Sequence, residues 1–209
     1  MTAPAQAIQW QRAAIVAVSD TSGQRALTFQ YNPETVRRTL EPNTVGGKPG
    51  SRSQAVRFAG APAETLTLDC RFAAWGSADS GDDEVAQDGI GPALAALTLF
   101  TYPSSQQVMA AQALLDQGSI QVIPPRAEEL LLVFGKRFVL PCEIQGMSIT
   151  EQLYDAQLTP VLATATLTLR VVTYSDVAES NRDYQRFLTY QQGLENLAQP
   201  AYDEGPVLP

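Results

Sequence analysis

The chain has 209 residues, of which 44% are hydrophobic and 17% charged, a formal net charge of −8 and no histidine. This length and composition suit one globular domain, or one domain with an appended tail. The lack of histidine excludes Ser-His-Asp and Cys-His catalysis, and it makes a structural zinc site with only two cysteines very unfavourable. The negative charge argues against nonspecific nucleic-acid binding, which needs Lys and Arg to neutralise phosphates.

The charge is spread unevenly along the chain. Residues 1–75 carry eight basic and five acidic side chains, whereas residues 76–209 carry six basic and seventeen acidic ones. We favour the simple interpretation that an acidic loop and tail lie in the second part. Opposite-sign faces for head-to-tail assembly are the alternative, because complementary potentials steer and register partners.

The compartment is predicted from three features. There is no apolar run near the ~20 residues that cross a bilayer, and the N-terminus, Met1-Thr-Ala-Pro-Ala, shows no signal peptide pattern. Cys70 and Cys142 each fall in the apolar phase of a strand pattern, which predicts core thiols rather than a disulfide framework. We therefore expect a protein that is cytoplasmic at synthesis, with no direct membrane insertion.

Strands are expected at the beginning of the chain. An apolar run over 13–18 is followed by an alternating strand in which Leu27, Phe29 and Tyr31 share a face, stopped by Asn32-Pro33. A glycine-rich basic loop follows over 44–53. Two more strands are predicted, around residues 56–58 and over 66–72, the second alternating with an apolar face of Leu66, Leu68, Cys70 and Phe72.

Helices are expected in the middle. After an acidic loop over 76–89, Pro92 suits the first turn of a helix with Leu94, Leu97 and Phe100 near one face. Ser104 and Gln107 form a capping-box pair for a second helix that ends at Gly118. This second helix is predicted to place three residues inward, with Leu114 at the edge of the stripe: Val108, Ala111 and Leu115. A short strand over 120–123 is expected next.

The last third returns to strands. A hairpin is predicted over 130–134 and 138–144, and the apolar phase then shifts at Gly146, which indicates a β-bulge with Met147 and Ile149 inward. The closing strand over 163–171 has Ala and Leu on one face and threonines on the other. Ser180 is expected to cap a final helix before a loose tail over 198–209, with this apolar stripe: Tyr184, Phe187, Leu188, Leu194 and Leu197.

No motif for chemistry is strong. Residues 46–51 look faintly like a phosphate loop, but Lys48 is followed by proline and the glycine spacing is wrong. Five carboxylates near residues 79–88 do not match a calcium-loop spacing, so a solvated loop is favoured over a cation site: Asp79, Asp82, Asp83, Glu84 and Asp88. Four strand aromatics are expected to pack in the core rather than to stack on sugars or bases: Phe58, Phe72, Trp75 and Phe138.

The order of the strand motifs points to a family. The segment Leu27-Thr-Phe-Gln-Tyr-Asn-Pro-Glu34 comes first; a hairpin over 131–140, a strand through Ile149 and a threonine-rich strand over 163–171 come later. This ordered set, covering roughly residues 13–175, resembles the tube-adaptor, or tube-initiator, proteins of phage-tail-like contractile injection systems. The resemblance implies a tail-tube fold, a strongly curved antiparallel sheet pair with a flanking helix. Six copies would form a ring whose sheets join edge to edge around an inner lumen.

The expected fold is therefore a β-rich α+β fold, a tail-tube-like antiparallel β-sandwich or barrel over residues 1–175, followed by a C-terminal helix and loose tail over 176–209. The resemblance implies a hexameric ring with the spike, the inner tube and baseplate components as partners. Relatives often carry a C-terminal LysM module, for which the 34 residues after Ser175 are too few. The long loops and helical tail favour an adaptor over a bulk tube subunit.

This interpretation assigns no catalytic, cofactor-binding or metal-binding residue, and it predicts a protein that is not an enzyme. Within it, Thr164, Thr166 and Thr168 would line the aqueous lumen. The rival hypothesis is a monomeric β-barrel that binds a lipid or a glycan.

Overall fold

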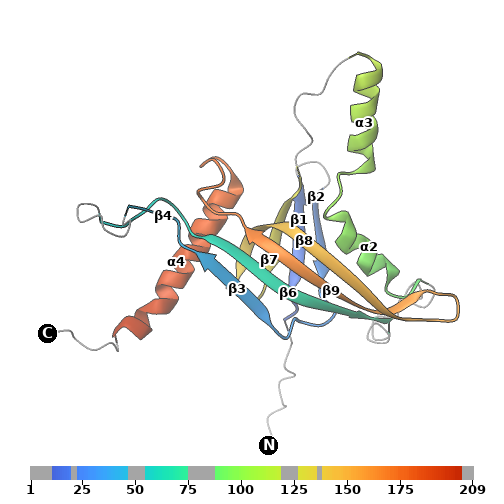
Figure 1. Ribbon diagram of the computed structural model, residues 1–209, viewed down its shortest axis with the longest axis horizontal. Coiled ribbons are helices and arrows are strands. Elements are labelled where there is room, and N and C mark those ends of the chain that lie inside the picture. The colour runs from blue at the N-terminus through green and yellow to red at the C-terminus, as the bar shows by residue number, and fades with distance from the viewer. Residues whose placement is uncertain are drawn as a thin grey trace, which may run out of the picture.

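The computed structural model describes residues 11–19, 23–46, 55–74, 88–118, 127–135 and 138–203. Nine strands and three helices follow one another in these ranges, which confirms the expected β-rich α+β fold (Figure 1). The strands are β1 (Ala14–Ser19), β2 (Gly23–Thr28), β3 (Val36–Glu41), β4 (Thr44–Val45), β5 (Arg57–Phe58), β6 (Ala63–Ala73), β7 (Glu129–Val133), β8 (Val139–Tyr154) and β9 (Pro160–Val171). The helices are α2 (Gly91–Leu99), α3 (Ser105–Asp116) and α4 (Arg182–Asp203).

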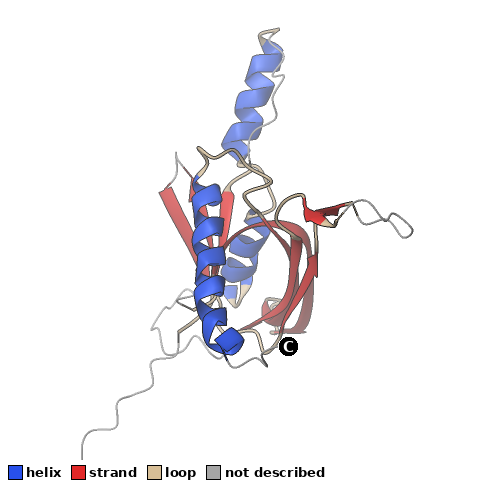
Figure 2. Ribbon diagram, turned by 90° about the vertical axis from the view of Figure 1, so that its left-hand side faces the viewer, coloured by secondary structure: helices blue, strands red, loops and turns tan. Residues whose placement is uncertain are grey.

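Seven strands form one antiparallel sheet in the order β2-β1-β7-β8-β9-β6-β3, and β4 and β5 form a separate short hairpin. The long strands curve strongly, as Figure 2 shows. The outer strands β2 and β3 do not pair with each other in the described part of the chain, so the sheet there stays open and does not close into a barrel.

Strict alternation on β6 and β9 builds the centre of the core. Leu66 and Leu68 of β6 lie opposite Leu169 and Leu167 of β9, and all four side chains are at most 1% exposed. The intervening threonines point to the other face, because successive side chains of a strand alternate. Both strand predictions are confirmed.

The β-bulge expected at Gly146 is also confirmed. The pairing of β8 with β9 passes from Ile144 opposite Leu169 to Gly146 opposite Thr168, so Gln145 is left out of the register. After the bulge, Met147 and Ile149 pack half-buried against the core. A second irregularity follows between Glu151 and Leu153, and it bends the end of this long strand.

The Asn-Pro turn differs from the expectation. The strand β2 ends at Thr28, so Phe29 and Tyr31 lie beyond it; Phe29 is fully buried and Tyr31 is 41% exposed. The Asn32 side chain accepts a hydrogen bond from the Ala13 N–H at 2.8 Å and donates one to the Gln11 carbonyl at 2.9 Å. This turn therefore anchors the segment that leads into β1.

The two middle helices behave differently. In α2, Leu94 and Leu97 are buried as expected, and Pro92 stands in the first turn. In α3 the capping box is present, with the Gln107 N–H donating to Ser104 Oγ at 3.2 Å and the Ser104 N–H to Gln107 Oε1 at 3.0 Å. The inward stripe is wrong, however: no residue of α3 is buried, and the helix stands away from the body of the protein (Figure 1).

The helix α4 packs on the core of the β-domain. Phe187 and Tyr190 join the main core and are 4% and 6% exposed, while Leu194 and Leu197 remain exposed. The cap is Asn181 rather than Ser180, because Asn181 Oδ1 accepts the Asp183 N–H at 2.9 Å. The helix also continues to Asp203, through the first half of the range expected as a loose tail.

None of the described helices is long and apolar enough to cross a membrane. The strand predicted over 120–123, residues 47–53 of the basic loop and most of the acidic loop over 76–89 fall outside the described residues.

Candidate assembly interface

The strands β8, β9, β6 and β3 form a four-stranded part of the sheet with an open edge on each side. On one side, β7 pairs only with residues 139–142 of β8, so residues 143–154 have β9 as their one partner among the described strands. On the other side, β3 is the last strand. In an alternating antiparallel sheet the first and fourth strands run in opposite directions. A junction between β3 of one copy and β8 of another would therefore be antiparallel, the slightly more stable pairing.

The outward-facing peptide groups of β3 follow from the register. The Gln30 side chain bonds both the Ala73 N–H and the Ala73 carbonyl, at 2.7 and 2.6 Å, on the side of β6 away from β9. Alternate residues of β6 thus point their peptide groups toward β3, where Thr65 is paired with Thr39. The peptide groups of the intervening residues on β3, Arg38 and Leu40 among them, face away from the sheet.

One face of this four-stranded part is polar. None of the described helices packs on it, because α2 and α4 both contribute to the core on the opposite face and α3 stands away from the body (Figure 1). Small hydroxyl side chains follow the strands on this polar face: Thr39, Thr65, Thr67, Ser148, Thr150, Thr164, Thr166 and Thr168. All of them are exposed or half-buried.

Three charged side chains on this polar face bond to neighbours: Asp69, Glu143 and Arg170. Thr166 Oγ1 donates to Asp69 at 2.6 Å, and Arg170 bridges Glu143 at 3.1 Å and Asp176 at 2.9 Å. Two carboxylates thus compensate the charge of Arg170 on this face.

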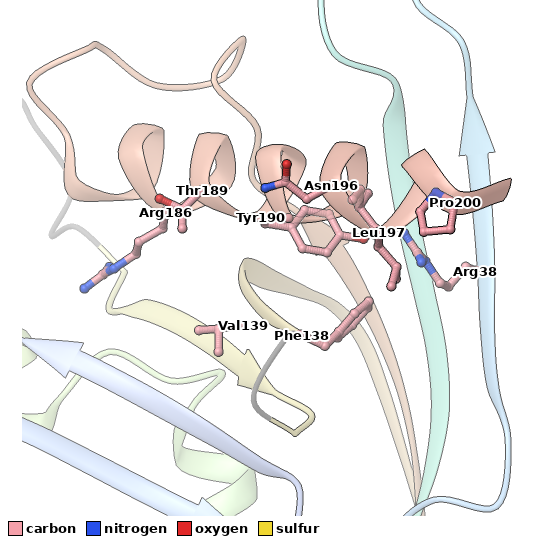
Figure 3. A pocket seen from close by; sticks show the side chains of 11 residues that line it. Arg38, Phe138, Val139, Arg186, Thr189, Tyr190, Asn196, Leu197 and Pro200 are labelled. Atoms are coloured by element: carbon pink, nitrogen blue, oxygen red, sulfur yellow. Dashed lines mark hydrogen bonds between the residues drawn. The ribbon is translucent and has the colours of Figure 1, made fainter. Parts of the chain in front are cut away.

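A groove of about 810 Å³ lies between α4 and the sheet, beside β3 (Figure 3). Much of its wall is apolar, from Phe138, Val139, Leu194, Leu197 and Pro200. Two arginines also line it, and both have partners within the chain. Arg186 bonds Asp183 at 2.6 Å and reaches Glu129 at 3.4 Å.

The other arginine, Arg38, joins three elements. Its Nε donates to Glu64 Oε1 of β6 at 2.8 Å, and its Nη2 donates to the Tyr190 hydroxyl of α4 at 2.6 Å. The guanidinium also lies 5.2 Å from the ring centre of Phe138. Glu64 is only 3% exposed, so Arg38 compensates a buried carboxylate. Burial and the Glu64 charge raise the pKa of the Tyr190 hydroxyl above its ordinary value, against the lowering effect of Arg38.

The aromatic residues singled out in the sequence do not gather in one site. Phe72 is buried, and Phe138 packs edge-on against Tyr190 with ring centres 5.6 Å apart. Phe58, expected in the core, is 85% exposed on the β4–β5 hairpin, because its two-residue strand pairs only with β4. Trp75 falls outside the described residues.

The cysteines and carboxylates show no reactive cluster in the described ranges. Cys70 and Cys142 are buried free thiols, and burial raises the pKa of each to about 12. Asp88 is exposed, whereas Asp79, Asp82, Asp83 and Glu84 lie outside the described residues. Within those residues, no group of three or more His, Cys, Asp or Glu side chains could hold a metal ion.

The sequence interpretation missed β3 and with it Arg38. The segment Val36-Arg-Arg-Thr-Leu-Glu41 does alternate, but the inward position at its centre is an arginine, which hides the apolar period. The available signal was that Val36, Arg38 and Leu40 alternate along the segment and would share one face of a strand. It points to a buried acid elsewhere in the fold.

The chain matches no protein-family model, and no curated protein matches it significantly. Among solved structures, a chain from the tail of an empty gene transfer agent particle, refined with C6 symmetry, is 10% identical with a TM-score of 0.30; the match covers 76% of this chain and 90% of that one. A chain from the native gene transfer agent virion is 8% identical (TM-score 0.29, same coverage).

A third similar chain comes from the six-fold symmetrised baseplate of the anti-feeding prophage. It is 14% identical, with a TM-score of 0.27 and coverage of 82% of this chain and 94% of that one. The three similar chains thus come from a tail, a virion and a baseplate. At these identities and TM-scores the likeness assigns no function to this chain.

Proposed function

We propose that this protein is a ring-forming structural subunit of a phage-tail-like contractile injection particle, and that its ring is the tube adaptor linking the spike and baseplate to the inner tube. The observation that carries the proposal is the four-stranded part of the sheet. Among the described residues it has open edges of opposite direction on its two sides and a threonine-rich face between them on which no described helix packs.

Ring closure explains both features together. Open strand edges present unpaired N–H and C=O groups and are prone to uncontrolled pairing, which closure into a ring prevents. The same closure would turn the threonine-rich faces of all copies toward one water-filled passage. Six copies, and the spike, inner tube and baseplate as partners, are what the sequence resemblance implies. The role is structural, and the proposed absence of catalysis rests on the absence of histidine from the sequence.

The β3 edge offers a direct test. Leu40→Pro removes an N–H that faces away from the sheet, and Leu40 is 49% exposed, so the domain should fold normally. We expect the wild-type protein to form rings of about six times 22.6 kDa in light scattering, and the proline variant to remain monomeric with an unchanged melting temperature.

Leu40→Ala is the matched control, because it removes the side chain and keeps the N–H. It should still form rings. A wild-type protein that is monomeric at all concentrations, or a Leu40→Pro variant that assembles as well as Leu40→Ala, would count against the proposal.

A monomeric lipid- or glycan-binding protein is the second candidate function. The apolar groove beside α4 is the observation that favours it, since ligand sites are commonly concave and apolar. Saturable binding of a lipid or glycan by a monomer, lost on Leu197→Lys, would support this candidate instead of the ring.

A further inference from the structure

The helix α3 presents an apolar stripe without a partner in the described chain. Val108 and Leu115 are 54% and 52% exposed and lie on one side of the helix, with Ala111 between them. The helix carries one charged residue, Asp116, at its last turn. Burying such a surface against a partner is favourable, because each Å² of apolar area removed from water contributes about 25 cal/mol.

The position of α3 relates it to the open edges of the sheet. In Figure 1, α2 and α3 extend beyond β8, whereas the C-terminal half of α4 extends beyond β3. Both α2 and α4 pack on the core face of the sheet. When β8 of one copy lies against β3 of the next, α3 of the first copy therefore projects over the next copy on the face that holds α4.

The groove beside α4 is apolar like the stripe on α3, and it lies next to the β3 edge over which α3 of the adjacent copy would project. It is bordered by Arg38 of β3, so it is continuous with the proposed β3 junction. Its apolar wall includes Leu194 and Leu197, which are 40% and 58% exposed. The two arginines that line the groove are already paired with carboxylates of the same chain. An occupant with little charge therefore fits the groove best.

We infer that α3 of one copy docks into the groove between α4 and β3 of the adjacent copy of this same chain. The inference rests on the proposed ring and adds a second contact to each junction. With 12 residues, the helix is about 18 Å long. Each subunit would then contact its neighbour twice, through the β3–β8 junction and through α3 in the groove.

Cysteine cross-linking tests the contact. One protein carries Leu115→Cys and another Leu197→Cys, and the two are mixed under mild oxidation. The native cysteines are buried, with pKa values raised to about 12, and should not react. We expect a disulfide-linked pair containing one chain of each kind, and a ladder up to the full ring when both substitutions are in one chain.

A charge substitution gives an independent readout. Leu115→Lys should raise the concentration for half-maximal ring assembly by about tenfold or more, the effect of losing one buried leucine. Ala113→Lys, about 160° away around the helix, is the matched control and should assemble like wild type. Neither position is buried, so both variants should fold.

The outcomes separate this inference from the proposed function. Rings that form without the mixed disulfide, and that assemble equally well with Leu115→Lys and Ala113→Lys, would overturn the docking of α3 and leave the ring standing. A chain that stays monomeric would overturn both.

Discussion

At the scale of single residues, Arg38 is the side chain on which most contacts converge. It lies on an edge strand, yet it compensates the buried Glu64, holds Tyr190 of α4 and covers Phe138. A buried carboxylate without a partner costs several kcal/mol, so the fold needs a cation at this position.

Substitution of Arg38 tests this role. Arg38→Met leaves Glu64 buried and unpaired, and we expect the free energy of unfolding in urea to fall by about 2–4 kcal/mol, somewhat below the range for fully buried pairs because Arg38 is one-third exposed. Tyr190→Phe removes a single hydrogen bond and should cost only about 1 kcal/mol.

The double variant Arg38→Met/Glu64→Leu provides the control. It removes the stranded charge and should recover much of the stability lost in Arg38→Met. If Arg38→Met and Tyr190→Phe were equally mild, Glu64 would not depend on Arg38 for its burial.

At the scale of elements, the sequence predicts what local patterns determine. Alternation identifies β6 and β9, the phase shift at Gly146 identifies the bulge, and Ser104 with Gln107 identifies the start of α3. These signals are carried by neighbours in the chain. The partner of an apolar stripe is not: the stripes of α3 and α4 look alike in the sequence, yet only Phe187 and Tyr190 of α4 reach the core.

The open edges escape prediction for the same reason. Whether Val36-Arg-Arg-Thr-Leu-Glu41 is a strand depends on its pairing with β6, and its central arginine is explained only by Glu64, 26 residues away in the chain. Phe58 shows the reverse error. Its pattern is that of a strand, but among the described strands it pairs with the two-residue β4 alone, and its side chain is 85% exposed.

The two faces of β9 give a prediction at this scale. Leu167 is fully buried, so Leu167→Asp places an unpaired charge in the core and should unfold the domain. Thr168→Asp, one residue away on the polar face, should keep the thermal transition of the wild type within a few degrees. Thr166 is a poorer control, because a carboxylate there would face Asp69. Circular dichroism melts of both variants measure the difference. An equal drop in melting temperature would mean that the two faces of β9 are assigned wrongly.

At the scale of the whole molecule, two of the described helices pack on the core and the third projects away from it. The core-facing residues of α2 and α4 cover one face of the curved sheet, the threonine-rich face is left uncovered, and α3 and the β4–β5 hairpin project away from the body (Figures 1 and 2). The proposed ring rests on these features: the strand edges that stay open among the described residues, and the projecting apolar helix α3.

The role of α4 decides where the domain ends, and truncation measures it. Residues 176–209 are expected from the sequence to be an appendage, but the core includes Phe187 and Tyr190, and Tyr174 stacks edge-on against Phe187 with ring centres 5.7 Å apart. Losing two buried aromatic side chains at about 1.5–3 kcal/mol each removes a large part of a typical stability of 5–15 kcal/mol.

A chain ending at Ser175 should therefore aggregate or lose its cooperative thermal transition, because Phe138 and the Arg38–Glu64 pair lose their cover. A chain ending at Asp203 keeps all of α4 and should melt like the full-length protein. Differential scanning calorimetry of the two chains distinguishes the alternatives. A soluble 1–175 chain with the full-length melting temperature would show that the β-domain is complete without α4 and that the helix serves docking alone.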